Sequence, residues 1–227
     1  MKGKKSKQKI YETAKRLFLE EGYLIGNRRI ATEANVSLGL IAYHFSSKRN
    51  IAVAILKEDY TILSAHLKNY LTPDQDILLY VLCFTNMTLR IREHDYKMAR
   101  FTTEIMKDDI LEASIYDGNQ KHEYAALMEL MEEDIPYEKK LKRALGTIFG
   151  VQRALQWNIN DGMDLSYQDY FEYMVKTYSF ALDLNYEKPK IKEIVKKSNT
   201  IVDEVFKDYS HLLDTSRYLY GQVEIEK

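Results

Sequence analysis

Two arginines follow Asn27 and could bind phosphate groups. Asn27 is a good helix cap, so Arg28 and Arg29 are expected in the first turn of a helix, where the helix dipole disfavours positive charge. A phosphate outside this helix end would turn the penalty into a favourable contact. Glu33, four residues after Arg29, leaves an ordinary surface ion pair as the alternative. The first chemistry that the sequence offers is therefore the binding of a polyanion.

A second set of candidate contacts begins at Gly39 and ends at Lys48. Tyr43 can bond a phosphate or lie against a thymine methyl group, and His44 can donate to phosphate. A glycine on the outer face of a helix lets the backbone approach a base edge closely, although Gly39 would equally suit tight packing between helices. Lys48 stands at an expected helix start, where its ammonium and the backbone N–H groups would form an anion site.

These side chains need a scaffold, and the segment GNRRIATEANVSLGLIAYHF at 26–45 predicts one. Its apolar residues have the spacing of two short helices, at about 28–34 and 38–44. Asn35 stands between them, where the turn needs a left-handed conformation that asparagine tolerates better than most residues, and Ser37 can cap the second helix. Two short helices joined by such a turn can place the second helix in the major groove of DNA.

The positive charge of the chain is concentrated at its N-terminal end. The 227 residues carry a net charge of −1. Residues 1–50 contain 11 Lys and Arg against 4 Glu, a net of +7, and the remainder has a net of −8. A basic head on a nearly neutral protein predicts that only the head meets a polyanion. A solvated basic tail remains the alternative for Lys2, Lys4 and Lys5.

The composition, with 45% hydrophobic and 30% charged residues, is that of a globular protein in solution. No apolar run approaches the length of a membrane span, and the N-terminus lacks the features of a secretory signal, so we expect a cytoplasmic location and no membrane partner. The lone Cys83 lies in an apolar run and is expected to be buried. Because no close histidine pair and no catalytic motif occurs, the sequence predicts no metal site, no cofactor and no enzymatic activity.

The apolar periodicity predicts helices along the whole chain, without a sustained strand pattern. A long helix from about Ser47 to Tyr70 would connect a small head to a larger body. Each proline is expected near a helix start, with Pro73 opening a helix at about 73–92. The other expected helices lie at 6–21, between 95 and 114, and at 119–133, 137–160, 166–184 and 190–213.

The pattern IATEANVSLGLIAYHFSSKRNI, following a helix such as ETAKRLFLEEGY, resembles the N-terminal domain of the TetR family of bacterial transcriptional regulators. The resemblance covers about residues 8–56. Its elements are an apolar-Ala pair, a turn ending in Val-Ser, an aromatic-containing helix that closes on Phe, and a Ser-Lys helix start. The chain departs from the family where Asn35 replaces glycine, where Asn27-Arg28 replaces threonine or serine, and where Ala42 replaces an aromatic residue. The departure at Ala42 leaves the base contacts open.

The resemblance implies an all-helical homodimer with a helix-turn-helix domain at 1–50 and a larger ligand-binding and dimerisation domain at 51–227. By position, the helices at 137–160 and 166–184 would form the dimer pair, although their apolar stripes suit an internal core equally well. The candidate DNA-binding residues are Arg28, Arg29, Ser37, Leu38, Gly39, Ala42, Tyr43, His44 and Lys48. The candidate interface residues are Leu145, Phe149, Tyr167, Phe171, Met174 and Tyr178.

The same resemblance implies a small-molecule pocket in the C-terminal domain, whose middle helices are rich in aromatic and soft side chains. Such groups would suit an apolar or aromatic effector, and aromatic faces beside Glu104 or Glu123 could hold a cation. Plain core packing is the alternative for each of them. The candidate pocket residues are Tyr80, Phe84, Met87, Phe101, Tyr124, Met128 and Trp157.

Together these features predict a ligand-responsive transcriptional regulator, with a repressor favoured over an activator. It would bind a near-palindromic double-stranded DNA operator as a homodimer and be released by a small molecule. One alternative is a helical adaptor whose helix-turn-helix unit binds protein, although an adaptor has no need of a strongly basic head. A second alternative is a small helical enzyme acting on an apolar substrate, against which the missing catalytic residues argue.

Overall fold

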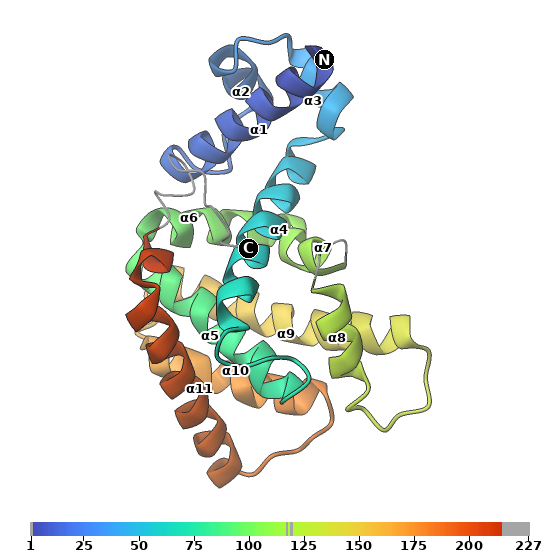
Figure 1. Ribbon diagram of the computed structural model, residues 1–227, viewed down its shortest axis with the longest axis vertical. Coiled ribbons are helices and arrows are strands. Elements are labelled where there is room, and N and C mark those ends of the chain that lie inside the picture. Colours follow the sequence, from blue (N-terminus) through green and yellow to red (C-terminus); the bar gives the residue numbers. More distant parts are fainter. Residues whose placement is uncertain (1, 117, 119, 215–227) are drawn as a thin grey trace.

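The computed structural model describes residues 2–116, 118 and 120–214, and its regular elements are all helices (Figure 1). The all-α class predicted from the sequence is confirmed. The N-terminal elements are α1 (Lys2–Glu20), α2 (Asn27–Glu33), α3 (Leu38–Phe45) and α4 (Lys48–Leu67). The remaining elements are α5 (Ile77–His94), α6 (Tyr96–Ile105), η1 (Met106–Asp108), α7 (Ile110–Tyr116), α8 (Lys121–Met128), α9 (Tyr137–Asn160), α10 (Tyr167–Ala181), α11 (Lys188–Asp208) and η2 (Ser210–Leu213).

Helices α1, α2 and α3 form a small head with its own apolar core. The core side chains are spaced at helical intervals on each element, so each helix turns one face inward. Burial of one such side chain stabilises the fold by about 1.5–3 kcal/mol. The fully buried members are Ile10, Leu17, Phe18, Ile30 and Ile41.

The turn between α2 and α3 fixes the angle at which α3 leaves the head. Asn35 has φ 49°, which confirms the predicted left-handed conformation. The N–H of Val36 donates to the carbonyl oxygen of Ala31 at 3.0 Å and closes the turn. The expected cap at Asn27 is wrong by one residue, because Gly26 is the N-cap of α2 and Asn27 is its first helical residue. Ser37 is the N-cap of α3, but its side chain makes no capping hydrogen bond.

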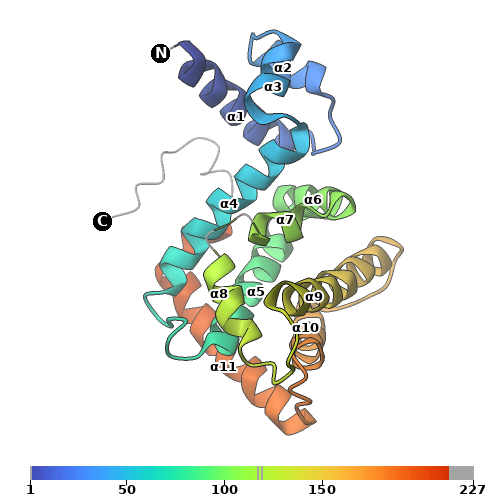
Figure 2. The same cartoon turned by 90° about the vertical axis from the view of Figure 1, so that its right-hand side faces the viewer.

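Helix α4 is unbroken and runs from the head into the body (Figures 1 and 2). It begins where the sequence predicts, because Ser47 Oγ caps it by accepting a hydrogen bond from the N–H of Asn50 at 3.2 Å. The helix packs against α1 and α3 at one end and against α5, α7 and α11 further along. The predicted domain boundary at residue 50 falls in its first turn, so head and body share one continuous rod.

Helix α5 lies at the centre of the body, where it contacts α4, α6, α8, α10 and α11. Leu82, Cys83 and Met87 on this helix are buried, as the sequence predicts for Cys83. The buried Asn86 is satisfied by donating to Ser198 Oγ on α11 at 2.9 Å. A buried amide with its hydrogen bonds made costs little, and it fixes the register of the two helices.

The start of α5 differs from the prediction. Pro73 lies outside a helix, and α5 begins at Ile77 because the Asp76 carboxylate caps it there. The residues before the cap form a turn in which the N–H of Thr72 donates to Gln75 Oε1 at 2.8 Å. A proline before an acidic residue fits a turn as well as it fits the first turn of a helix.

Candidate nucleic-acid interface

The recognition candidate α3 has one buried and one exposed face. Ile41 is buried against the head core, whereas Leu38 is 46% exposed and Tyr43 is 79% exposed. Gly39 and Ala42 are exposed as well, and no heavy atom lies within 4 Å of a Cβ added at Gly39. The alternative of tight helix packing at Gly39 therefore does not apply within one protomer. Helix α3 lies near the tip of the molecule (Figure 1), and Tyr43 is exposed there.

The first turns of α1 lie beside the C-terminal end of α3. Ser6 Oγ and His44 Nε2 are 2.7 Å apart and hydrogen-bonded. The Lys7 ammonium lies 5.5 Å from the ring centroid of Phe45. His44 is therefore half-buried and partly committed to α1, whereas the sequence predicts a free donor for phosphate. The contact brings a lysine-rich helical segment next to α3, and the sequence signal for it is the run KGKKSKQK, which extends α1 back to Lys2.

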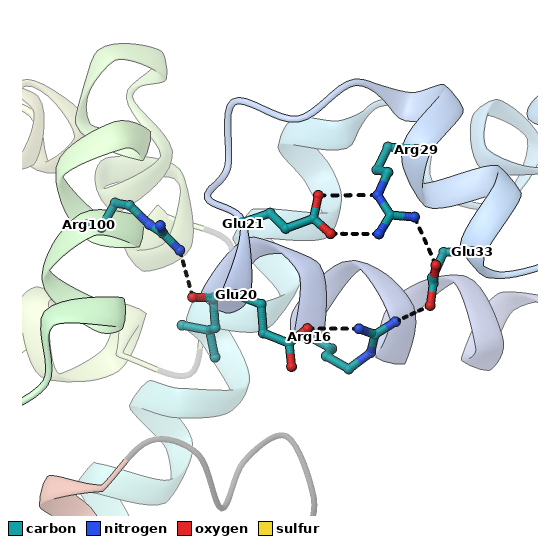
Figure 3. A network of polar contacts seen from close by, with 7 residues as sticks. Arg16, Glu20, Glu21, Arg29, Glu33 and Arg100 are labelled. Carbon is teal, nitrogen blue, oxygen red and sulfur yellow. Dashed lines mark hydrogen bonds and ion pairs between the residues drawn. The ribbon is translucent and has the colours of Figure 1, made fainter.

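Arg29 makes the ion pairs that the sequence offers as the alternative to a phosphate contact. Its guanidinium bonds Glu21 at 2.7 Å and Glu33 at 2.8 Å (Figure 3). Glu33 is shared with Arg16, which also bonds Glu20 at 2.8 Å. The hydrogen bonds to the two glutamates raise the pKa of Arg29 above its ordinary value. Because this network is exposed, it orders the α1–α2 contact more than it stabilises the fold.

The positive charge of the head is therefore divided into paired and unpaired groups. Lys15, Arg16 and Arg29 have carboxylate partners. A second group of head cations is exposed and makes no ion pair within the described part of the chain. This group, named here the unpaired cations, consists of Lys4, Lys5, Lys7, Lys9 and Arg28. Four of the five are on the half of α1 that approaches α3, so the free positive charge gathers around the exposed helix.

Lys48 does not form the anion site expected from the sequence. Its Nζ donates to the carbonyl oxygens of Tyr23 and Ile25 at 2.7 and 2.9 Å, and it lies 4.2 Å from the ring centroid of Tyr23. Burial lowers the pKa of this ammonium below its ordinary value. The side chain thus ties the loop between α1 and α2 to the start of α4, and its charge is directed inward.

Two adjoining cavities lie in the body, each with a volume of about 40 Å³. The first lies between α4, α5, α6 and α9, and the second extends toward α8 and α10. Both have mixed walls of apolar and polar side chains. The residues that line both cavities are Tyr60, Thr88, Leu111 and Gln152.

The predicted pocket residues are only partly brought together. Phe84 and Tyr124 line the second cavity. Trp157 is 67% exposed on α9, so its indole belongs to the outer surface and the prediction for it is wrong. The other four are buried in the core and line neither cavity, because they fill the space between helices. These four are Tyr80, Met87, Phe101 and Met128.

The predicted interface residues face the interior of the protomer instead of its surface. Tyr178 is bonded to Tyr124 at 3.1 Å, and Tyr167 donates to Asn86 in the core. The remaining four are buried, and two of them line the second cavity. These four are Leu145, Phe149, Phe171 and Met174. The strong apolar stripes of α9 and α10 are therefore satisfied within one chain.

Over the described residues, no group of His, Cys, Asp and Glu side chains is arranged to hold a metal ion. No helix in that part of the chain has the length and apolar character needed to cross a membrane.

A short helix, anchored by Ile41 and carrying exposed residues on its other face, follows a tight turn beside unpaired cations. This geometry is that of a helix-turn-helix unit, which in DNA-binding proteins places its second helix in the major groove. Residues 10–55 match the family described as "Bacterial regulatory proteins, tetR family". The N-terminal domain of the chain is therefore similar to the DNA-binding domain of TetR-family transcriptional regulators.

Two solved structures resemble the chain more weakly. A protein described as a TetR-family transcriptional regulator from Mesorhizobium loti has 12% sequence identity and a TM-score of 0.44, over 81% of this chain and 98% of that chain. A protein described as a gamma-butyrolactone receptor (ArpA-like) has 16% identity and a TM-score of 0.34, over 90% and 100% of the two chains. No curated protein matches the sequence.

Proposed function

We propose that this regulator binds a near-palindromic operator as a homodimer and that a small molecule bound in its body releases it. One observation carries the DNA-binding part of the proposal: Ile41 anchors α3 to the head while Tyr43 and its neighbours face outward. Two such helices related by a two-fold axis would enter major grooves about 34–36 Å apart or slightly more. A regulator that a ligand releases from its operator acts as a repressor, and we expect it in the cytoplasm.

The residues around α3 are proposed to divide the work of binding. Tyr43, Ala42 and Gly39 are exposed on the outer face of α3 and are the candidates for contacts with bases. The unpaired cations, which include Arg28 on α2, are the candidates for contacts with phosphate. The logarithm of the affinity falls linearly with the logarithm of the salt concentration. Each phosphate that these cations neutralise should make this fall steeper by about 0.9.

Substitution of Arg28 and of Tyr43 should have different effects on DNA binding. Arg28→Ala is expected to weaken binding to all DNA sequences alike and to make the dependence of affinity on salt shallower by about 1 on logarithmic axes. Tyr43→Ala is expected to cost about 1–3 kcal/mol on the operator and less on unrelated DNA, because a base contact is lost. Fluorescence anisotropy at several salt concentrations, with DNA from upstream of the gene and with a shuffled duplex, measures both effects.

The control variant is Lys192→Ala, which removes an exposed cation on α11, far along the chain from the head. It should change neither the affinity nor the salt slope. If the wild-type protein gives no competitor-resistant binding to the upstream DNA at moderate salt, that DNA contains no operator. If the Arg28 and Tyr43 variants behave identically, the division into phosphate and base contacts is wrong.

The homodimer is proposed to form on the outward face of α9 and α10, which lie side by side along one edge of the body (Figure 2). Trp157 is 67% exposed and Phe180 is 73% exposed on this face, and Tyr173 is exposed between them. A Cβ added at Gly146 or Gly150 would meet no heavy atom within 4 Å, so these glycines form an open strip along α9. A second copy could approach the strip closely and cover the aromatic rings.

Helix α6 is proposed to connect effector binding to the head. Met98 and Thr102 on this helix line the first cavity. Glu104, on the same helix, accepts hydrogen bonds from the backbone N–H groups of Tyr23 and Leu24 in the loop after α1. A ligand that enlarges the cavity would displace α6 and, through Glu104, the loop that leads to α2.

Two further features hold α6 to the head. Arg100 donates to the carbonyl oxygen of Leu19 at 2.9 Å (Figure 3). Gly22 has φ +99°, and a Cβ at this position would lie 2.7 Å from Glu104 Oε2. Only a residue without a side chain allows the carboxylate to come this close while the backbone adopts a left-handed conformation.

Removal of the Glu104 carboxylate should loosen the connection between α6 and the head. Hydrogen bonds to a charged group contribute about 1.5–3 kcal/mol, so Glu104→Ala should accelerate amide hydrogen exchange at Tyr23 and Leu24 by about tenfold or more. Exchange followed by mass spectrometry on the peptide that spans the loop measures this. Glu93→Ala, an exposed position on α5, is the control. Unchanged protection in the Glu104 variant would show that the loop is held by other contacts.

A helical adaptor that binds protein through α3 is the alternative function. An exposed α3 would serve an adaptor equally, but the unpaired cations beside it favour a polyanion. The DNA titration above separates the two functions, because an adaptor would bind the upstream and shuffled duplexes alike and weakly.

A further inference from the structure

The first cavity is lined by an acidic side chain that has one buried oxygen without a hydrogen bond from the described residues. Asp59 on α4 is 5% exposed, lines the cavity, and its Oδ1 receives no hydrogen bond from the described residues. Burying a carboxylate without a partner is costly, and proteins rarely keep such a group unless it serves a function. The rest of the wall combines polar side chains with apolar ones, among them Leu56, Leu63 and Ile91.

The neighbouring charges do not neutralise Asp59. The charge of Lys15 on α1 lowers the pKa of Asp59, but the Lys15 ammonium also bonds Glu58 at 2.9 Å. Glu58 adds a further negative charge near Asp59. Burial, the largest effect, raises the pKa of Asp59 to about 7. The carboxyl group is therefore partly protonated at neutral pH and gains from any cation that enters the cavity.

Arg92 also lines the cavity, but its charge is directed elsewhere. Its guanidinium donates to Gln156 on α9 and lies 5.9 Å from the ring centroid of Tyr170 on α10. No ion pair joins it to Asp59 within the described residues. The Arg92 Nε is buried and unbonded, so the cavity wall offers a donor as well as the acceptor at Asp59.

We infer that the effector is a small apolar molecule carrying a protonated amine, which Asp59 binds as its counter-ion. The inference rests on the proposed function, because it names the chemical class of the ligand that this cavity takes. Tyr60 follows Asp59 on α4 and lines both cavities, so its ring can lie against the amine or the apolar body of the ligand. An ion pair formed out of water is worth more than one at the surface.

The size of the cavity sets a further condition. Its volume of about 40 Å³ has room for a few water molecules. Pockets for drug-sized ligands are usually about 300–1,000 Å³. The amine must therefore be small, or it must open the wall shared with the second cavity at Thr88 and Gln152.

Benzylamine and benzyl alcohol form a matched pair of probes, because they differ in charge and hardly in shape. Isothermal titration of the full chain at pH 8 should give at least tenfold tighter binding of the amine. Asp59→Asn should remove this preference and leave the alcohol unaffected. Glu123→Gln is the matched control, since Glu123 is also a buried carboxylate with an unbonded oxygen but does not line this cavity. Circular dichroism of each variant establishes that it is folded.

The affinity for benzylamine should depend on pH, and it would not do so if Asp59 acted only through its shape. With the pKa of Asp59 at about 7, wild-type affinity for benzylamine should fall about tenfold from pH 8 to pH 6, and that of the Asp59 variant should not change. Equal binding of the two probes, no binding of benzylamine at millimolar concentration, or a preference that survives in Asp59→Asn would each overturn the inference. The DNA titration is evaluated separately. A protein that does not bind the operator but still prefers benzylamine would contradict the proposed DNA binding and leave the amine site intact.

Discussion

If the proposed homodimer forms on the α9–α10 surface, Phe180→Asp should convert it into a monomer and weaken operator binding at least a hundredfold. Phe180 is 73% exposed on α10 of a single protomer, and such a large exposed ring is expected to be covered in the assembly. Aromatic residues at the centre of an interface contribute about 2–4 kcal/mol when truncated, and a buried charge in their place costs more. A monomer presents one α3 to one half-site and loses the joint binding of two.

The surface around Phe180 explains why this position should dominate. Gly146 and Gly150 on α9 are exposed and lack a side chain, so a partner helix can reach the backbone there. Trp157 and Tyr173 continue the apolar surface toward the other end of the α9–α10 pair. Positions 146 and 157 are about 16 Å apart along the helix at 1.5 Å per residue, which gives a long and narrow contact. A second copy related by a two-fold axis would place the same strip against itself.

Sedimentation velocity across a range of protein concentrations measures the change, and the anisotropy titration gives its effect on DNA binding. Tyr96→Asp is the matched control, because Tyr96 is 71% exposed on α6 and lies outside the α9–α10 surface. A monomeric wild-type protein, or a Phe180 variant that remains dimeric with full operator affinity, would refute this interface. A monomer that still binds the operator with full affinity would refute the requirement for a dimer.

The helix-turn-helix unit could be predicted from the sequence because its geometry is determined locally. Asn35 marks the left-handed turn, and Ser47 marks the start of α4 within one residue. The helix predicted at 137–160 has the observed bounds Tyr137–Asn160, since its apolar stripe is long and regular. In each case the decisive interactions are between residues close in the chain.

Contacts between distant segments could not be predicted in the same way. The Lys48 ammonium turns toward Tyr23 and Ile25, and nothing in the sequence near Lys48 indicates those carbonyl groups. The α10 stripe predicts which face is buried, but not whether a second copy or the same chain covers it. Phe180 illustrates this limit of prediction from the sequence. It does not break the apolar spacing of α10, and it differs from the core phenylalanines only in its position around the helix.

The polar wall of the cavity was missed for a related reason. Asp59 lies among the apolar positions of α4, where one acidic residue in a long helix is easily assigned to the solvent-exposed face. The periodicity does not place it there, since it falls between Ile55 and Leu63 on the buried side. A charged residue at a position that the apolar pattern assigns to the interior is the signal that could have identified it.

Asp59→Asn should stabilise the protein at pH 8. The folded state holds the Asp59 proton up to a pKa of about 7, whereas the unfolded chain releases it near the ordinary value of 3.8. Between these two values the unfolded chain binds fewer protons than the folded protein, so this group lowers the stability as the pH rises. Above about pH 7 the penalty is complete, and the difference between the two pKa values corresponds to on the order of 4 kcal/mol.

The amide has no ionisation to suppress, so the gap in stability between variant and wild type should widen from about pH 4 to about pH 7 and then stay constant. Urea unfolding at several pH values measures the gap as a difference between two curves, which removes the contribution of every other titrating group. Asp74→Asn, at an exposed position, should show no gap at any pH. A variant less stable than the wild type at pH 8 would mean that the ionised Asp59 has a partner that stabilises it. In that case the carboxylate would not be available to bind an amine.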